Sequence, residues 1–380
     1  MTYQNPFQYG SDPFAMLDDD GYYYILCSGW RFYRTKDLVH YEDLGKAYEP
    51  KETDWFYGPA SAPEIYHFGD KYYIFHTTEA HDNPYDEDEN RKIGVLVADS
   101  PMGPFEDPLG RPLLDTPYCA IDIHVYHEDD HFYLYWCHSC YHHPVGRNDL
   151  EESWIYAAEM KPDFTGIIGD PILQVRPCQE WENHTIPLHK RRWNEGPFVL
   201  KHNGTYYMTF SGCTFEDYGV GYATAPTPLG PWTKAPENPI LHEVPEKGIF
   251  APGHNSFTWS KDGKELFMVY HMITDSPFMD PETVAENKRK PFFVAKELDK
   301  MAPRTEVDEV NKLDAVLQPL PTDGYALQHW PGYAPEYMNR LGCKDDGRKI
   351  AIDRVHFTED GKMVLEGPNV DPQPFPSGNE

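Results

Sequence analysis

Residues 193–211 read WNEGPFVLKHNGTYYMTFS, and this stretch decides the fold. Glu195 stands just ahead of an apolar run, a His-Asn-Gly-Thr turn follows, and an aromatic run ends the stretch. Two β-prone runs joined by a short turn that contains Gly are typical of a β-hairpin. The stretch therefore predicts a hairpin with a carboxylate at its entrance.

The same order of a polar leading residue, a hydrophobic run, a turn and an aromatic run occurs five times in the chain. The other four leading residues, with their two runs, are Asp12 with PFAML and YYYIL, Glu64 with IYHF and KYYIFHT, Asp122 with IHVYH and FYLYW, and His254 with NSFTWS and ELFMVYH. A β unit of about 40 to 50 residues cannot bury both of its faces alone, so repeated units pack against one another. We therefore predict an all-β fold, a five-bladed β-propeller.

The repeat also predicts where the polar leading residues lie. In a propeller the first strand of each hairpin lines the central channel, and these strands all run the same way along its axis. Their starts should therefore meet at one mouth of the channel. The candidate site residues at that mouth are Asp12, Asp122, Glu195 and His254.

Composition limits the classes of partner. The chain has 380 residues, with 62 acidic against 33 basic side chains and a formal net charge of −29. This balance argues against nucleic acid and anionic membranes, because both attract a positive surface. An acidic, solubilising surface explains the charge, and a preference for calcium or a salt-tolerant source are the alternatives. Aromatic residues make up 15% of the chain, and the faces of Tyr and Trp suit sugar rings.

The sequence offers few signs of export or membrane insertion. The start, MTYQNPFQYGSDPF, has neither a basic region followed by an apolar run nor a small-residue cleavage site, so we expect no signal peptide. No stretch reaches about 18 consecutive apolar residues, so we expect no membrane span. Seven cysteines, an odd number, fit reduced thiols better than a disulfide framework. The sequence therefore predicts a cytoplasmic protein.

The five hairpins carry a resemblance to a known family. The segments SDPFAMLDDDGYYYI, APEIYHFGDKYYIFHT, AIDIHVYHEDDHFYLYW, EGPFVLKHNGTYYMTFS and GHNSFTWSKDGKELFMVYH closely resemble glycoside hydrolase family 43, whose members are five-bladed propellers. The resemblance spans roughly residues 5–272 in order, and GRKIAIDRVHF at 347–357 is similar to the family's closing segment. By this resemblance Asp12 is the general base, Asp122 orients and tunes the acid, and Glu195 is the general acid.

The resemblance also implies roles for two further residues. His254 corresponds to a residue that binds a metal ion, often calcium, in the channel, and Arg348 to an arginine that contacts the sugar. No organic cofactor is implied. Each residue alone has a plain structural explanation, since Asp12 could cap a turn, Glu195 could be a loop acid and His254 a core histidine.

Hydrolysis of a glycosidic bond explains these residue types without the family. A single displacement needs one carboxylic acid to protonate the leaving oxygen and one carboxylate to deprotonate a water molecule on the opposite face of the sugar. A third carboxylate beside the acid raises the pKa of the acid by repulsion, which gives Asp122 a role.

Two departures from the family pattern limit the substrate prediction. Many members have Trp before Ala-Pro-Glu as a platform under the sugar, where this chain has Ser61. Either Trp30 or Trp55 takes that role, or the pocket accepts a sugar of a different shape. The second departure is an atypical insertion at about 276–346 before the closing segment 347–368, within a single domain over 1–380. This insertion could be a lid, a dimer contact or an added edge structure.

We therefore predict an inverting exo-glycosidase that releases terminal pentose residues from imported plant oligosaccharides. By resemblance the activity is that of an α-L-arabinofuranosidase, a β-xylosidase or both. The alternatives are a galactosidase-type activity within the same family and a non-catalytic sugar-binding propeller. The substrate is an oligosaccharide, and a homo-oligomer is possible.

Overall fold

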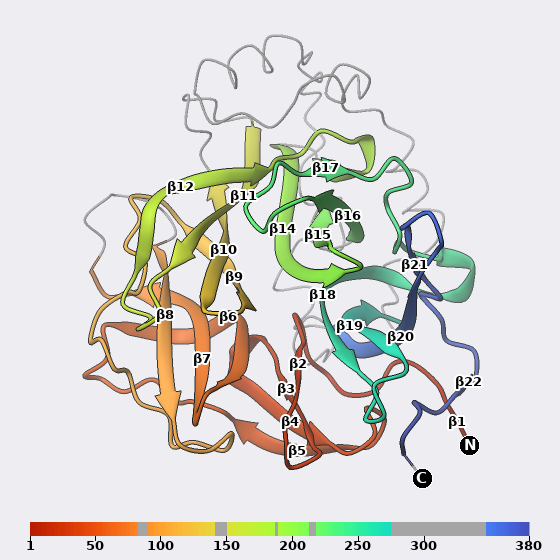
Figure 1. The fold of residues 1–380 in the computed structure, drawn as a ribbon, viewed down its shortest axis with the longest axis horizontal. Coiled ribbons are helices and arrows are strands. Elements are labelled where there is room, and N and C mark those ends of the chain that lie inside the picture. Colours follow the sequence, from red (N-terminus) through yellow and green to blue (C-terminus); the bar gives the residue numbers. More distant parts are fainter. Residues whose placement is uncertain (83–89, 141–149, 187–188, 213–217, 275–346, 380) are drawn as a thin grey trace.

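The computed structural model describes residues 1–82, 90–140, 150–186, 189–212, 218–274 and 347–379. These residues form β-strands grouped into sheets around a common centre (Figure 1). The predicted insertion at 276–346 lies outside the described residues, so the single-domain organisation over 1–380 stays a prediction. None of the helices in the described ranges has the length and apolar character needed to cross a membrane.

The strands follow one another as five blades, which confirms the predicted propeller. Blade 1 contains β2 (Phe14–Leu17), β3 (Tyr23–Leu26), β4 (Arg31–Thr35) and β5 (Tyr41–Lys46). Blade 2 contains β6 (Phe56–Phe68), β7 (Lys71–Ala80) and β8 (Arg91–Ala98). Blade 3 contains β9 (Ala120–Glu128), β10 (His131–Cys140), β11 (Leu150–Met160) and β12 (Ile167–Val175).

The last two blades complete the circle. Blade 4 contains β14 (His189–His202), β15 (Thr205–Gly212), β16 (Gly219–Ala225) and β17 (Thr233–Lys234). Blade 5 contains β18 (Phe250–Trp259), β19 (Leu266–Ile273), β20 (Lys349–Phe357) and β21 (Met363–Leu365). The start of β14 pairs on one side with β13 (Asn183–Ile186) and on the other, in parallel, with β11, so blades 3 and 4 are continuous.

The stretch 193–211 forms the hairpin that the sequence predicts. His202 of β14 pairs with Thr205 of β15, which leaves Asn203 and Gly204 as a two-residue loop. Both loop residues have positive φ, 47° and 83°. This conformation gives a turn whose twist matches that of the two strands, and Asn-Gly is the pair that adopts it most easily.

Hydrophobic packing between neighbouring blades holds the ring together. In the described part of the chain, the five largest clusters of buried apolar residues lie between blades 1 and 2, 2 and 3, 3 and 4, 4 and 5, and 5 and 1. Trp30 belongs to the first of them and Phe267 to the last. Each blade thus buries one face against each neighbour, as repeat architectures require.

Polar contacts between the blades also run around the whole circle. At each junction a side chain of one blade accepts a hydrogen bond from a backbone N–H at the channel strand of the next. The pairs are Ser28 with Ala62 (2.8 Å), Tyr66 with Val125 (2.9 Å), Asp122 with Gly196 (3.2 Å), Ser211 with His254 (2.8 Å) and Ser256 with Ala15 (3.1 Å). The last pair returns from blade 5 to blade 1, so the ring is closed by hydrogen bonds as well as by apolar packing.

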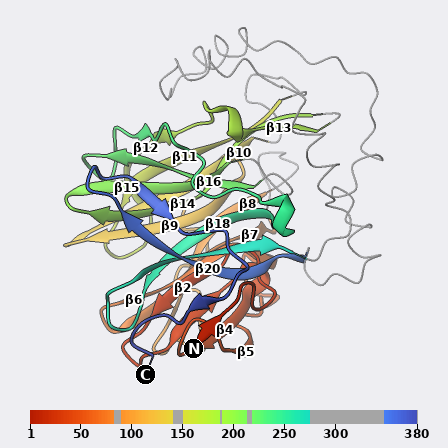
Figure 2. The same cartoon turned by 90° about the vertical axis from the view of Figure 1, so that its right-hand side faces the viewer.

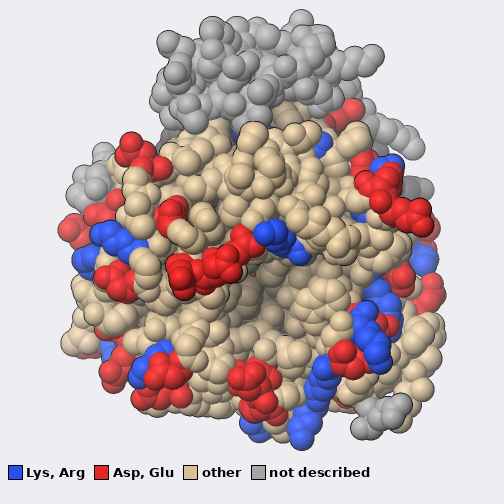
Figure 3. All heavy atoms as spheres, in the orientation of Figure 1, with Lys and Arg blue, Asp and Glu red and all other residues tan. Residues whose placement is uncertain are grey.

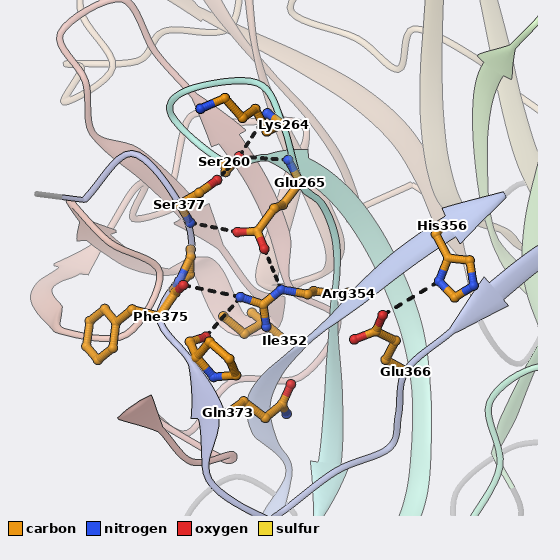
Figure 4. A network of polar contacts seen from close by, with 12 residues as sticks. Ser260, Lys264, Glu265, Ile352, Arg354, His356, Glu366, Gln373, Phe375 and Ser377 are labelled. Carbon is orange, nitrogen blue, oxygen red and sulfur yellow. Dashed lines mark hydrogen bonds and ion pairs between the residues drawn. The ribbon is translucent and has the colours of Figure 1, made fainter. Parts of the chain in front are cut away.

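The two ends of the described chain lie next to each other (Figure 2). Near the N-terminus β1 (Thr2–Tyr3) pairs with β22 (Gln373–Pro374) near the C-terminus. Arg354 of β20 bonds Glu265 at 2.7 Å and the carbonyls of Pro374 and Phe375 (Figure 4). The closing segment is therefore fixed to blade 5, where it supplies the two outer strands.

The surface around the ring carries many charged groups. Figure 3 shows a hollow at the centre of one face, with acidic side chains along its upper border. This distribution agrees with the strongly negative formal charge of the sequence.

Candidate active site

Each blade has a residue with left-handed backbone conformation in its channel strand or, in blade 1, just before that strand. These residues are Asp12 (φ 54°), Ala62 (φ 40°), Asp122 (φ 54°), Gly196 (φ 57°) and His254 (φ 44°). For a residue with a Cβ this conformation costs roughly 1–2 kcal/mol, so the surrounding structure must hold it. The hydrogen bonds between blades stabilise this conformation, because the backbone N–H groups of Ala62, Gly196 and His254 donate three of them.

Asp12 lies beside His254, Arg348 and His271, and burial lowers the pKa of His271 to about 4. Its Oδ1 lies 3.4 Å from Nδ1 of His254, 3.4 Å from Nδ1 of His271 and 3.6 Å from Nη1 of Arg348. Ser28 donates a hydrogen bond of 2.5 Å to its Oδ2. Burial by itself raises the pKa of Asp12, but His254, His271 and Arg348 together outweigh burial and bring the pKa below the usual range. Asp12 is therefore ionised and can accept a proton.

Glu195 has the opposite environment. It is 5% exposed, and its Oε2 accepts a hydrogen bond of 2.6 Å from Nε1 of Trp193. The hydroxyl of Tyr218 donates to Oε1. Burial raises the pKa of Glu195 in spite of these two donors, and the charge of Asp12 adds to the effect. Glu195 can therefore hold a proton at a pH where Asp12 has none.

Asp122 lies close to Glu195 in the same buried region. Burial, followed by the charges of Glu195 and Asp12, raises the pKa of Asp122 to about 7, although His254 opposes the change. Its Oδ2 accepts the hydrogen bond from the N–H of Gly196, which directly follows Glu195. Two neighbouring buried carboxyl groups with raised pKa values titrate as a coupled pair, so the protonation of Asp122 and that of Glu195 depend on each other.

His254 faces two of the carboxylates. Its Nδ1 lies 3.4 Å from Asp12 and 4.0 Å from Asp122. Burial lowers the pKa of His254, but Asp12, Asp122 and Glu195 together raise it above its ordinary value. A Cβ at Gly196 would lie 3.0 Å from Nδ1, so glycine allows the ring this close approach. His254 therefore acts as a cation that keeps Asp12 ionised.

The structure thus brings Asp12, Asp122, Glu195, His254 and Arg348 together from distant parts of the sequence. Arg348 reaches the group from the segment that precedes β20, where its guanidinium lies 5.2 Å from the centre of the Tyr218 ring. Paired carboxylates with separated pKa values are the requirement for acid and base catalysis at one site.

The comparisons with known proteins agree with this chemistry. A family model for glycosyl hydrolases family 43 matches residues 3–293. The chain belongs to this family. A solved structure of a thermostable family-43 glycoside hydrolase is 30% identical, each chain covers all of the other, and the TM-score is 0.72.

Curated relatives of this family 43 chain have related names. A β-D-galactofuranosidase of Aspergillus niger is 35% identical over 47% of the chain and 46% of the relative. Two extracellular exo-α-(1→5)-L-arabinofuranosidases, from Streptomyces avermitilis and Streptomyces chartreusis, are 26% and 27% identical. The match to the Streptomyces avermitilis enzyme covers 74% of this chain and 59% of that enzyme. The match to the Streptomyces chartreusis enzyme covers 71% of this chain and 82% of that enzyme. It therefore spans about half the length of the first two relatives.

These relatives correct the predicted cytoplasmic location. Both Streptomyces enzymes are named extracellular, which contradicts this prediction. The prediction relied on the lack of a recognisable signal peptide or membrane span and on the odd number of cysteines. Cys27 and Cys137 are fully buried, and burial raises the pKa of both thiols. Buried thiols of this kind are inert, so their number does not report the redox compartment.

The structure also corrects the role expected of Trp30 in this family 43 site. Trp30 is 1% exposed, packs against Tyr48 and Phe56, and donates a hydrogen bond of 3.1 Å to the carbonyl of Gly58. A ring without an exposed face cannot stack on a sugar. Ser61, at the place of the family tryptophan, instead contacts the guanidinium of Arg91.

Four residues of the site escaped the sequence analysis. Trp193 could have been found, because residues two apart in a strand share a face and Trp193 precedes Glu195 by two. Ser28, Tyr218 and His271 have no local signal. Ser28 follows β3, Tyr218 precedes β16 and His271 lies in β19, and only the tertiary packing brings them to the carboxylates.

Proposed function

We propose that this family 43 chain is an inverting exo-glycosidase that releases terminal pentose residues from oligosaccharides. The supporting observation is the pair of opposite carboxyl environments, with Asp12 held ionised by cations and Glu195 held protonated by burial. Asp12 removes a proton from a water molecule as this water attacks the anomeric carbon. Glu195 donates its proton to the glycosidic oxygen as the bond to the sugar breaks.

Other site residues support these two transfers. Arg348 and His254 keep Asp12 anionic until the proton arrives. Asp122 lies beside the acid, where burial and the charges of Glu195 and Asp12 raise its own pKa to about 7 and its carboxyl group accepts the hydrogen bond from the N–H of Gly196. Arg348 also has the planar donor set that binds sugar hydroxyls, which supports its proposed contact with substrate.

The names of the relatives support an α-L-arabinofuranosidase, with β-xylosidase activity as a second component. The Aspergillus niger relative favours a galactofuranosidase as the alternative, since arabinofuranose and galactofuranose share a five-membered ring. The three carboxylates support catalysis over mere sugar binding. Self-association remains a prediction that light scattering would test.

A panel of nitrophenyl glycosides tests the function, and proton NMR tests the stereochemistry. We expect the highest kcat/KM on α-L-arabinofuranoside, ahead of β-D-xyloside and β-D-galactofuranoside. The first-formed sugar should have the opposite anomeric configuration to the substrate, because a base and an acid separated by about 6.5–9.5 Å leave room for water. Retained configuration would make Asp12 a nucleophile, and activity on none of the glycosides would contradict the proposal.

We propose that a calcium ion at His254 is loosely held and largely hydrated. The described residues contain no group of three or more His, Cys, Asp or Glu side chains that could hold a metal. Calcium prefers six to eight oxygen ligands, and one ring nitrogen of His254 already faces Asp12 and Asp122. A histidine that binds a metal must be a neutral imidazole, so the ion would take the place of the positive charge of His254 beside Asp12 and would be held by this one ring and a shell of water.

Removal of such an ion should destabilise the protein. We expect chelation to lower Tm by a few degrees and calcium to restore it, because a ligand that binds only the folded state stabilises that state. Magnesium added in place of calcium is the control. If Tm is the same with chelator and with calcium, His254 has no metal and serves only as the cation beside Asp12.

A further inference from the structure

The two hydrogen-bond partners of Glu195 differ in what they can do. Trp193 meets Oε2 through its indole N–H at 2.6 Å, and Tyr218 meets Oε1 through its hydroxyl. All three side chains are buried, with exposures of 1% for Trp193, 6% for Tyr218 and 5% for Glu195. An indole N–H can only donate a hydrogen bond, whereas a phenol hydroxyl can donate or accept.

This difference decides which oxygen of Glu195 carries a proton. A hydrogen on Oε2 would point at the hydrogen of the Trp193 N–H, and two hydrogen-bond donors that face each other form no hydrogen bond. A hydrogen on Oε1 faces the Tyr218 oxygen, which can accept it. We propose that Oε1 of Glu195 carries the transferred proton and that Tyr218 is a positioning residue that orients this proton for transfer.

The proposal rests on the proposed function and adds one step to it. Before the reaction, the Oε1–H group of Glu195 points at Tyr218. With substrate bound, this hydrogen turns from the Tyr218 oxygen to the glycosidic oxygen. The Oε1–H bond then breaks with its electron pair left on Glu195, and the glycosidic oxygen takes the proton and keeps the electron pair of the broken C–O bond. Tyr218 then turns its hydroxyl hydrogen toward the new carboxylate. Solvent returns a proton to Oε1 after the product leaves.

Tyr218 is held firmly enough for this task. The guanidinium of Arg348 lies over its ring, and the ring of His271 packs edge-on with centroids 5.3 Å apart. The backbone at Gly253 lies so close that a Cβ there would be 2.7 Å from the Tyr218 ring. Burial, followed by the charge of Glu195, raises the pKa of Tyr218 well above its ordinary value, so the hydroxyl keeps its own hydrogen.

Removal of the Tyr218 hydroxyl should therefore affect proton donation and leave sugar binding intact. For Tyr218→Phe we expect kcat to fall about 10- to 100-fold on alkyl glycosides and less than about threefold on dinitrophenyl glycosides, with KM little changed. Tyr218 donates to the ionised form of Glu195 and so lowers the pKa of Glu195. Its loss should move the alkaline limb of the pH profile to higher pH.

The other charged groups that influence the alkaline limb of the pH profile are unchanged in Tyr218→Phe. They are Asp12, Asp122 and His254 around Glu195, and Arg348 across the Tyr218 ring. Tyr222→Phe is a matched control, because Tyr222 donates a hydrogen bond of 2.5 Å to Glu237 outside the site. We expect this control to keep the activity and pH profile of the wild type.

The outcomes separate this inference from the proposed function. An inactive wild type would contradict the function itself. An active wild type whose Tyr218→Phe variant loses activity equally on all leaving groups, with an unmoved alkaline limb, would make Tyr218 purely structural. If the variant does not fold, neutron diffraction of the wild-type protein below pH 7 shows directly which oxygen of Glu195 carries the hydrogen. A hydrogen on Oε1 supports the proposal and a hydrogen on Oε2 overturns it.

Discussion

Asp12→Asn is expected to lower kcat by roughly 10²- to 10⁴-fold on activated and unactivated glycosides alike. The reason is that water must lose its proton whatever the leaving group is. Asn retains an oxygen that can accept the hydrogen bond from Ser28. It also tolerates the left-handed conformation at this position, where φ is 54°. The fold should therefore survive while the base is removed.

Initial rates on a dinitrophenyl and an alkyl glycoside provide the measurement, with Tm recorded for each variant. Asp129→Asn is the matched control, because Asp129 has the same φ of 54° in an exposed turn between β9 and β10. The control should keep wild-type activity. A loss below about tenfold in Asp12→Asn, with the fold intact, would remove Asp12 from the role of base.

Glu195→Gln is expected to divide substrates by leaving group. We expect kcat to fall by roughly 10²- to 10⁴-fold on alkyl glycosides, because the leaving alkoxide needs a proton, and far less on dinitrophenyl glycosides, whose leaving group needs none. A plot of log kcat against leaving-group pKa should be much steeper for the variant than for the wild type.

Glu237→Gln is the matched control, since Glu237 also accepts a tyrosine hydroxyl but lies outside the site. The slope of this control should equal that of the wild type. An unchanged slope in Glu195→Gln would assign the proton donor to another group, with Asp122 the first candidate because its pKa is raised to about 7.

The same titrations set the expected pH dependence. The acid must be protonated, so activity should fall as the pH rises through the pKa of Glu195, which burial raises above its ordinary value. The base must be ionised, and the lowered pKa of Asp12 moves the acidic limb below the range usual for carboxylates.

The five hairpins, and the position of their leading residues at one mouth of the channel, could be predicted from the sequence. Two β-prone runs on either side of a turn such as Asn203-Gly204 specify a hairpin locally. Hairpins with this shared pattern pack side by side and run in the same direction. The leading residues Asp12, Asp122 and His254 consequently take equivalent positions. In blade 4 that position belongs to Gly196, one residue after Glu195, although the channel strands of blades 2 to 5 all have a register shift at this point.

The tertiary structure alone decided the chemistry of each carboxylate. Asp12 and Glu195 look alike in the sequence, yet one is ionised by Arg348 and His254 and the other is kept protonated by burial. Trp30 was one of two candidates for the platform under the sugar, but the junction of blades 1 and 2 buries it. Desolvation and charge act through space over a few ångströms, so residues hundreds of positions apart set these properties, and no local pattern records them.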